Sequence, residues 1–66
     1  MKKIINVLIM LVILVLHYRS GYIQTFNNVD IYTITSKYIS ILTEDMNVPI
    51  YIDRSKILYW EEINNG

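Results

Sequence analysis

Apolar residues follow two different patterns along this chain. Residues 4–16 read IINVLIMLVILVL, with twelve apolar residues out of thirteen, whereas from residue 22 onward apolar and polar residues alternate in short runs. A run without charge, Gly or Pro favours burial in a bilayer, removal as a signal peptide, or burial inside a protein core. We therefore divide the chain into residues 1–20, a membrane anchor or signal segment, and residues 21–66, a small β-rich tail.

The apolar run predicts a single transmembrane signal-anchor helix. As a helix, residues 4–18 would be about 22 Å long, which is short against a hydrocarbon core of about 30 Å. Lys2 and Lys3 can snorkel and Tyr18 can lie at headgroup level, so a slightly thinned bilayer can be spanned. The predicted membrane-anchor residues are Ile4, Ile5, Val7, Leu8, Ile9, Leu11, Val12, Ile13, Leu14, Val15 and Leu16.

Two other interpretations of the run stay open. Its length fits the apolar region of a secretory signal peptide, but no A-x-A pattern follows, and Ser20 or Gly21 would have to precede the cut. The run also fits a buried strand, because periodicity cannot separate helix from strand where Val, Ile and Leu fill nearly every position. A length of thirteen residues favours the helix.

Charge predicts how an anchored chain is oriented. The formal net charge is zero, but residues 21–66 carry three basic and six acidic residues, a net charge of −3. Lys2, Lys3 and the amino terminus outweigh Arg19, so the positive-inside rule places the N-terminus in the cytoplasm and the C-terminal tail outside it. The acidic tail lacks a basic stripe, which argues against a nucleic-acid partner.

The tail predicts a small all-β domain of about four or five short strands. β-branched and aromatic residues dominate it, and Asn27–Asn28 indicates a turn. Strands are expected over residues 29–35, 38–43, 48–52 and 57–63, and residues 22–26 form either a further strand or a membrane-lying segment. Pro49 lacks a backbone donor, so its strand belongs at a sheet edge.

The order of elements in residues 38–63 is strand, acidic turn, strand, tight turn, strand. Residues 44–47 and 53–56 are the two polar tetrads that form these turns. This succession resembles part of an SH3-like or Sm-like barrel, and it also fits any β-meander. The resemblance implies a partial barrel and assigns no functional residue.

Size limits what the tail can do alone. Domains this small usually need disulfides, a metal or oligomerisation, and this chain has no Cys and one His. A Cys/His zinc site cannot be built from these residues. Support is therefore expected from the membrane, from a protein partner or from self-association.

Catalytic chemistry is not indicated. His17 stands at the end of the apolar run and fits the headgroup zone. Glu61 and Glu62 are neighbours in a predicted strand, so their carboxylates should point to opposite faces rather than to one substrate atom. With two separated Gly residues there is no phosphate-binding loop. We expect no enzyme activity, no cofactor, no metal and no small-molecule substrate.

One group of residues is typical of an interface. Aromatic side chains anchor many protein interfaces, although in a domain this small they can equally form the core. The predicted interface residues are Tyr51, Ile57, Tyr59 and Trp60. We expect a non-enzymatic accessory or interaction protein of a membrane complex or, if phage-borne, of the host envelope. The alternatives are a cleaved, secreted β-rich binding module and a membrane-active toxin or holin-like peptide.

Overall fold

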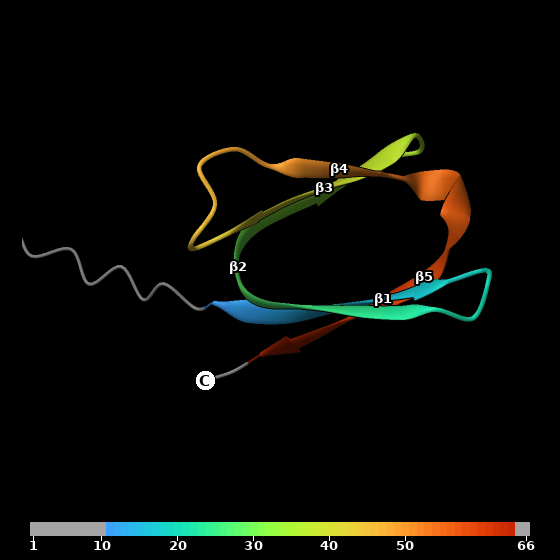
Figure 1. The fold of residues 1–66 in the computed structure, drawn as a ribbon, viewed down its shortest axis with the longest axis horizontal. Coiled ribbons are helices and arrows are strands. Elements are labelled where there is room, and N and C mark those ends of the chain that lie inside the picture. The colour runs from blue at the N-terminus through green and yellow to red at the C-terminus, as the bar shows by residue number, and fades with distance from the viewer. Residues whose placement is uncertain (1–10, 65–66) are drawn as a thin grey trace, which may run out of the picture.

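The computed structural model describes residues 11–64 and places them in a five-stranded antiparallel sheet (Figure 1). The elements are β1 (Val12–Tyr18), β2 (Ile23–Ile34), β3 (Tyr38–Thr43), β4 (Ile50–Asp53), the 3-10 helix η1 (Arg54–Lys56) and β5 (Ile57–Asn64). The order across the sheet is β4-β3-β2-β1-β5, so the last strand returns to pair with the first. The prediction of a small all-β domain is confirmed.

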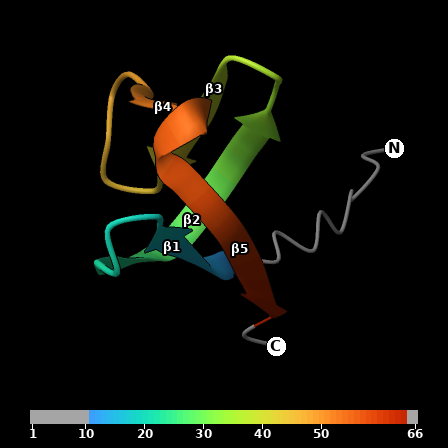
Figure 2. The ribbon, with the colours of Figure 1, turned by 90° about the vertical axis from the view of Figure 1, so that its right-hand side faces the viewer.

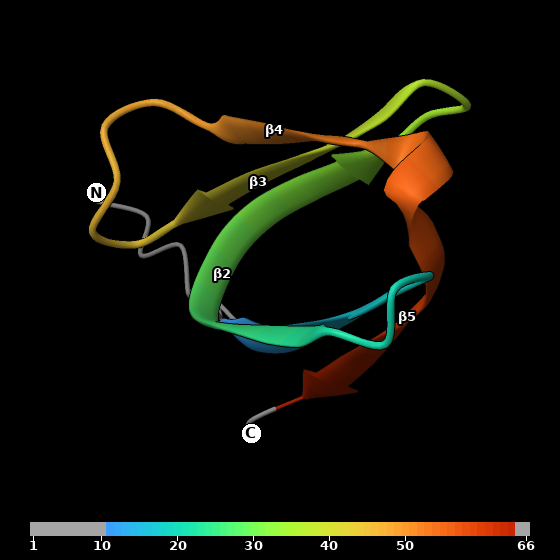
Figure 3. The same cartoon turned by 45° about the vertical axis from the view of Figure 1, so that its right-hand side comes forward.

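β2 belongs to two layers because it bends in its middle. Figures 1 and 3 show it curving from the layer of β1 and β5 into the layer of β3 and β4. Asn28 has a φ of 54°, in the left-handed region that Asn enters more readily than most residues. The pairing of β2 with β1 and with β3 is irregular on either side of this residue. The predicted turn at Asn27–Asn28 is therefore wrong, because these residues bend a continuous strand instead of ending it.

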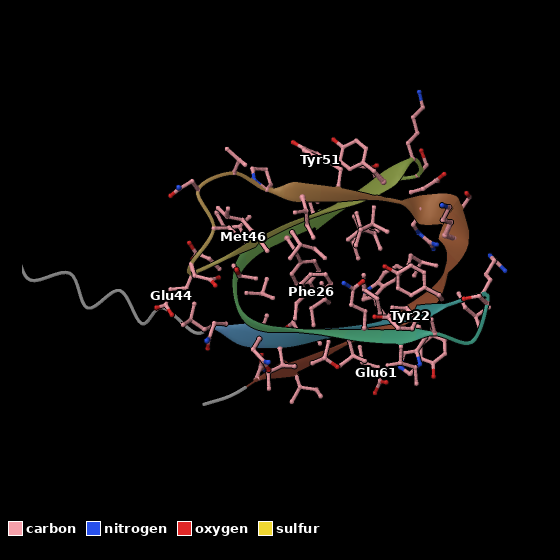
Figure 4. All side chains as sticks on the ribbon, viewed as in Figure 1. Tyr22, Phe26, Glu44, Met46, Tyr51 and Glu61 are labelled. Carbon is pink, nitrogen blue, oxygen red and sulfur yellow. The ribbon has the colours of Figure 1, made fainter. Side chains whose placement is uncertain are left out.

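The core lies between the two layers. Alternate residues of the strands point into this space, and Figure 4 shows Phe26 there. The buried apolar residues are Leu14, Leu16, Phe26, Val29, Ile39, Ile41 and Ile57. Leu14 and Leu16 are fully buried, so the strand that follows from the apolar run supplies two of the largest core side chains.

The helical prediction for the end of the apolar run is wrong, because residues 12–18 form strand β1. β1 pairs with β2 on one side and with β5 on the other, so its backbone polar groups are satisfied by two ladders. β1 is seven residues long, which is an ordinary length for a strand. Residues 1–10, with most of the predicted anchor, lie outside the described residues. Within residues 11–64, no helix has the length and apolar character that a membrane span requires.

The strands expected within residues 38–63 are found to within two residues, since β4 begins at Ile50 instead of residue 48 and β5 extends to Asn64. β3 has the predicted bounds, and β4 is an edge of the sheet, as Pro49 just before it requires. The second polar tetrad contains η1, where Asp53 caps the turn by accepting a hydrogen bond from the backbone N–H of Ser55. In the β1–β2 turn, Gly21 has a φ of 97°, a conformation that favours glycine.

Candidate functional site

The outward side of the β1 layer carries a continuous group of apolar and aromatic side chains. Because Leu14 and Leu16 point into the core, the alternate residues of β1 point away from it. The strand register places β5 residues on one side of them and β2 residues on the other. We call this surface the β1 face, and it consists of Ile13, Val15, His17, Ile23, Thr25, Tyr59, Glu61 and Ile63.

The rim of the β1 face is well exposed. Ile23 is 55% exposed and Ile63 is 47% exposed, although both are large aliphatic residues. Ile13 lies opposite Ile63 in the β1–β5 ladder, so these side chains adjoin at one end of the face. Among the described residues, no further strand or helix lies over this side of the sheet (Figure 1). The exposed Ile23 and Ile63, and part of Ile13, therefore remain available for contact with another molecule.

His17 is held in place on the β1 face by two side chains of β5. Its ring stacks on Tyr59 with 4.1 Å between the ring centroids and 15° between the planes. Its Nε2 lies 2.6 Å from Oε2 of Glu61. Because the ring is stacked and one nitrogen is already hydrogen-bonded, His17 is oriented as a rigid part of the surface. The expectation that His17 lies in a headgroup zone remains a prediction.

The two neighbouring acids of β5 point to opposite faces, as predicted. Glu61 lies across from Val15 on the β1 face, whereas Glu62 lies across from the buried Leu14. The Glu62 carboxylate accepts a hydrogen bond from the hydroxyl of Tyr32. This hydrogen bond, with smaller contributions from burial and from the Glu62 charge, raises the pKa of Tyr32 to about 12. The two carboxylates therefore have separate partners and do not converge on one point.

The predicted interface residues do not form one cluster. Ile57 is fully buried in the core, and Trp60 is half-buried against it. Tyr59 lies on the β1 face, whereas Tyr51 is 63% exposed on the outward side of β4, where it contacts Tyr38 edge-on. In Figure 4, Glu61 and Tyr51 mark the two opposite outer sides, with Phe26 between them.

A polar hollow lies at the end of the molecule near the β2 bend. Its volume is about 380 Å³, and Asn27, Asn28, Glu44 and Asp45 are among the residues that line it. Glu44 and Met46 mark this end of the molecule in Figure 4. No group of three or more His, Asp or Glu residues within residues 11–64 is arranged to hold a metal ion.

The β1 face was not predicted from the sequence because both sides of β1 are apolar. Ile13 and Val15 point outward, and Leu14 and Leu16 point inward, so the strand shows no alternation of polar and apolar residues. Ile63 was the residue of this face that the sequence could have indicated as exposed. It is an aliphatic residue directly after two acids, and it lies apart from the other apolar residues of the predicted strand.

Comparison with known proteins adds no relative. No family model matches the chain, and neither a curated protein nor a solved structure matches it.

Proposed function

We propose that this chain is a non-enzymatic interaction protein that acts at a membrane, and that its β1 face binds a protein partner. The single observation that carries the proposal is the exposure of Ile23 and Ile63, with half-buried Ile13 beside Ile63, around an ordered His17–Tyr59 pair. Isolated exposed apolar residues are ordinary, but a contiguous group on one sheet face marks an interaction surface. The group also contains Tyr and His, which combine an apolar body with a polar tip.

A protein surface fits this face better than a lipid surface. Glu61 lies in the middle of the face, opposite Val15, and its carboxylate carries the hydrogen bond to His17. A bilayer surface with anionic lipids would repel this carboxylate, whereas a protein partner can place a donor or a cation against it. The apolar rim with a polar centre therefore requires a partner with apolar side chains around one hydrogen-bond donor.

The membrane part of the proposal rests on the N-terminal segment. In a chain that spans the membrane, Lys2 and Lys3 before the apolar residues would favour a cytoplasmic N-terminus with the tail outside the cytoplasm. If β1 is formed, residues 4–11 are left, about 12 Å as a helix, which is too short to span about 30 Å of hydrocarbon. We therefore propose membrane attachment through a shallow apolar segment in the folded state.

A secreted form is the alternative, and the fold restricts where it can be cut. Cleavage near Tyr22 would remove β1, whereas cleavage before Val12 would keep the whole sheet. Mass spectrometry of the N-terminus separates the two: an intact Met1 supports membrane attachment, and a new terminus before Val12 supports a secreted binding module.

We also propose that the sheet is a partial barrel of the SH3-like or Sm-like type. Two features support this: β5 returns to pair with β1, and the bend in β2 lets the same strand serve two layers. An experimental structure of the full chain tests it, and a flat sheet without the bend at Asn28 would contradict it.

Photo-crosslinking tests the partner-binding face with a matched control. The photoreactive residue p-benzoylphenylalanine replaces Tyr59, which lies on the β1 face, or Tyr51, which lies on the opposite outer side. Both changes replace one exposed aromatic ring with another. We expect irradiation of cells to give a protein adduct from position 59 and none from position 51, and Ile63→Lys to reduce its yield. Equal adducts from both positions, lipid adducts from position 59 or no adduct at all would contradict the proposal.

A further inference from the structure

The two edges of the sheet differ in length and in protection. β4 forms one edge with four residues, and Pro49 directly before it has no backbone N–H to offer a further strand. β5 forms the other edge with eight residues and contains no Pro. Figures 1 and 2 show the two edges in different layers, so they do not pair with each other. β5 is therefore the longer edge to which a strand of another molecule can be added.

The outer edge of β5 has unpaired backbone groups from Leu58 onward. Alternate residues of an antiparallel strand direct their N–H and C=O groups to opposite sides, and only the side toward β1 is paired. The carbonyl of Ile57 accepts a hydrogen bond from Nη1 of Arg54 (3.0 Å), so η1 occupies the start of the strand. Within residues 11–64, no hydrogen bond from outside β1 reaches the backbone of residues 58–64. This edge therefore presents a row of free donors and acceptors.

The side chains of β5 that lie on the β1 face form an apolar, acidic, apolar series with a period of two. Tyr59 is 48% exposed and Ile63 is 47% exposed, and the Glu61 side chain between them is 52% exposed. Tyr59 stacks on His17, and Oε2 of Glu61 lies 2.6 Å from Nε2 of the same ring, so both are ordered before a partner binds. A carboxylate has about four acceptor positions, so Glu61 can accept a further donor.

Charge favours a basic partner over a second copy of this chain. β5 carries Glu61 and Glu62 and no basic residue. In a twofold-symmetric pair of β5 strands, opposite residues are antiparallel and lie on the same face. A pair centred on any residue from 60 to 63 would therefore place Glu61 or Glu62 directly opposite or diagonal to its own copy, where like charges repel. A strand with a Lys or Arg opposite Glu61 gains an opposite-charge pair instead.

We propose that the partner of the β1 face binds through an extended segment that adds a strand to the outer edge of β5. The segment has a Lys or Arg opposite Glu61 and apolar residues two positions before and after it, opposite Tyr59 and Ile63. Backbone hydrogen bonds supply the affinity of such a complex, and the alternate side chains supply its specificity. This inference rests on the proposed function and specifies the chemistry of the partner.

Peptide titration of the full-length chain in dodecyl maltoside tests the added strand. The probe is a capped peptide of sequence Thr-Val-Thr-Lys-Thr-Val-Thr. We expect saturable amide chemical-shift changes at residues 59–63 and none at residues 50–53 of the other edge. Methylation of the peptide nitrogens at alternate residues gives two control peptides with the same side chains. One set of nitrogens faces β5 and its methylation should abolish binding, whereas methylation of the other set should be tolerated.

The charge pair is tested on both molecules. Replacing the Lys of the peptide with Glu should abolish measurable binding, because a like charge then lies opposite Glu61. Glu61→Gln should weaken binding of the Lys peptide about two- to fivefold, the size expected for one cross-strand charge pair. Glu44→Gln makes the same chemical change in the connection between β3 and β4, away from β5, and should leave the affinity unchanged.

Several outcomes would overturn the added strand. It fails if the Lys peptide does not bind saturably, if the two methylated peptides do not differ, or if the Glu peptide binds as tightly as the Lys peptide. It also fails if Glu44→Gln weakens binding as much as Glu61→Gln. A dimer in sedimentation velocity whose residues 59–63 are protected from hydrogen exchange would show that a second copy occupies the edge, and this too would overturn the inference.

The crosslinking result separates this failure from failure of the proposed function. A protein adduct from position 59 without peptide binding keeps the partner on the β1 face and removes the added strand. Peptide binding without an adduct in cells keeps the strand site on β5 and removes the proposed function.

Discussion

The substitutions Leu14→Ala and Ile13→Ala distinguish a β-strand at these positions from a membrane-spanning helix. Both substitutions remove the same number of carbon atoms from neighbouring residues of the apolar run. In β1, however, Leu14 is fully buried in the core, whereas Ile13 is half-buried on the outward β1 face. In a lipid-embedded helix the two losses would be similar, because both side chains would lie in hydrocarbon.

The expected difference is large relative to the stability of so small a domain. A fully buried Leu→Ala substitution costs about 2–5 kcal/mol, and a substitution outside the core costs about 1 kcal/mol or less. At roughly 0.05–0.15 kcal/mol per residue, residues 11–64 would have a total stability of about 3–8 kcal/mol. Leu14→Ala should therefore leave the domain marginally folded or unfolded, and Ile13→Ala should not.

Equilibrium unfolding in urea measures this difference. The fluorescence of Trp60 is a suitable signal, because Trp60 lies across from Leu16 and packs against the core. The full-length chain is used in a non-ionic detergent, and far-UV circular dichroism checks that each variant keeps its strands. Equal losses of unfolding free energy for Leu14→Ala and Ile13→Ala would refute the assignment of β1.

Three further results are expected. A chain reduced to residues 21–66 should show no cooperative thermal transition by circular dichroism. The reason is that β5 loses its strand partner and the core loses two Leu residues. A cooperative transition from a dilute monomer would contradict this. Tyr32 should titrate near pH 12 in absorbance at alkaline pH, and Glu62→Gln should lower its pKa. Because the folded state keeps this proton longer than an unfolded chain with a tyrosine pKa of 10.0, stability should fall as pH rises from about 10 to about 12. Ser55→Ala should raise the pKa of Asp53 toward 3.8 in a carboxyl NMR titration, so less stability is lost as pH falls through that range.

Alternation of apolar and polar residues was sufficient to predict the strands that have one solvent-exposed face. β3 alternates buried Ile39 and Ile41 with less buried neighbours, and its bounds were predicted correctly. Pro49 correctly indicated an edge strand, because a missing backbone donor excludes a central position. In these segments, the local sequence pattern and the position of the strand in the sheet require the same types of residue.

β1 could not be identified in this way, because its two faces have the same apolar character. The thirteen-residue run favoured a helix by length alone, yet the strand begins at Val12 and includes only the end of the run. The pairing that decides this comes from β5, whose residues lie 39 to 52 positions later in the chain than their partners in β1. A long-range pairing of this kind leaves no local periodicity at the strand that it stabilises.

The residues that come together on the β1 face and at the end of the sheet that carries the β1–β2 and β2–β3 turns could not be predicted from the linear sequence either. Tyr59 and Trp60 are adjacent, so their side chains point to opposite sides of the strand, and the predicted interface is divided among the core, the β1 face and the outward side of β4. All of β2 lies between the β1–β2 turn and the β2–β3 turn, and these turns lie at the same end because the bend at Asn28 folds the two halves of that strand back on each other (Figure 1).

The transmembrane helix predicted from the sequence and the observed sheet would compete for the same residues. A helix that spans the membrane through Leu16 removes β1, and with it two fully buried Leu side chains and the strand on which β5 pairs. A folded β1, in turn, leaves a segment too short to cross the hydrocarbon core. In a chain that inserts as predicted from the sequence, membrane insertion and folding of the β domain would therefore be coupled in opposite directions, and anything that binds only the folded domain would shift the chain out of the bilayer by mass action. A partner on the β1 face would do this directly, because Ile13 and Val15 point toward that partner in the sheet and toward lipid in the helix.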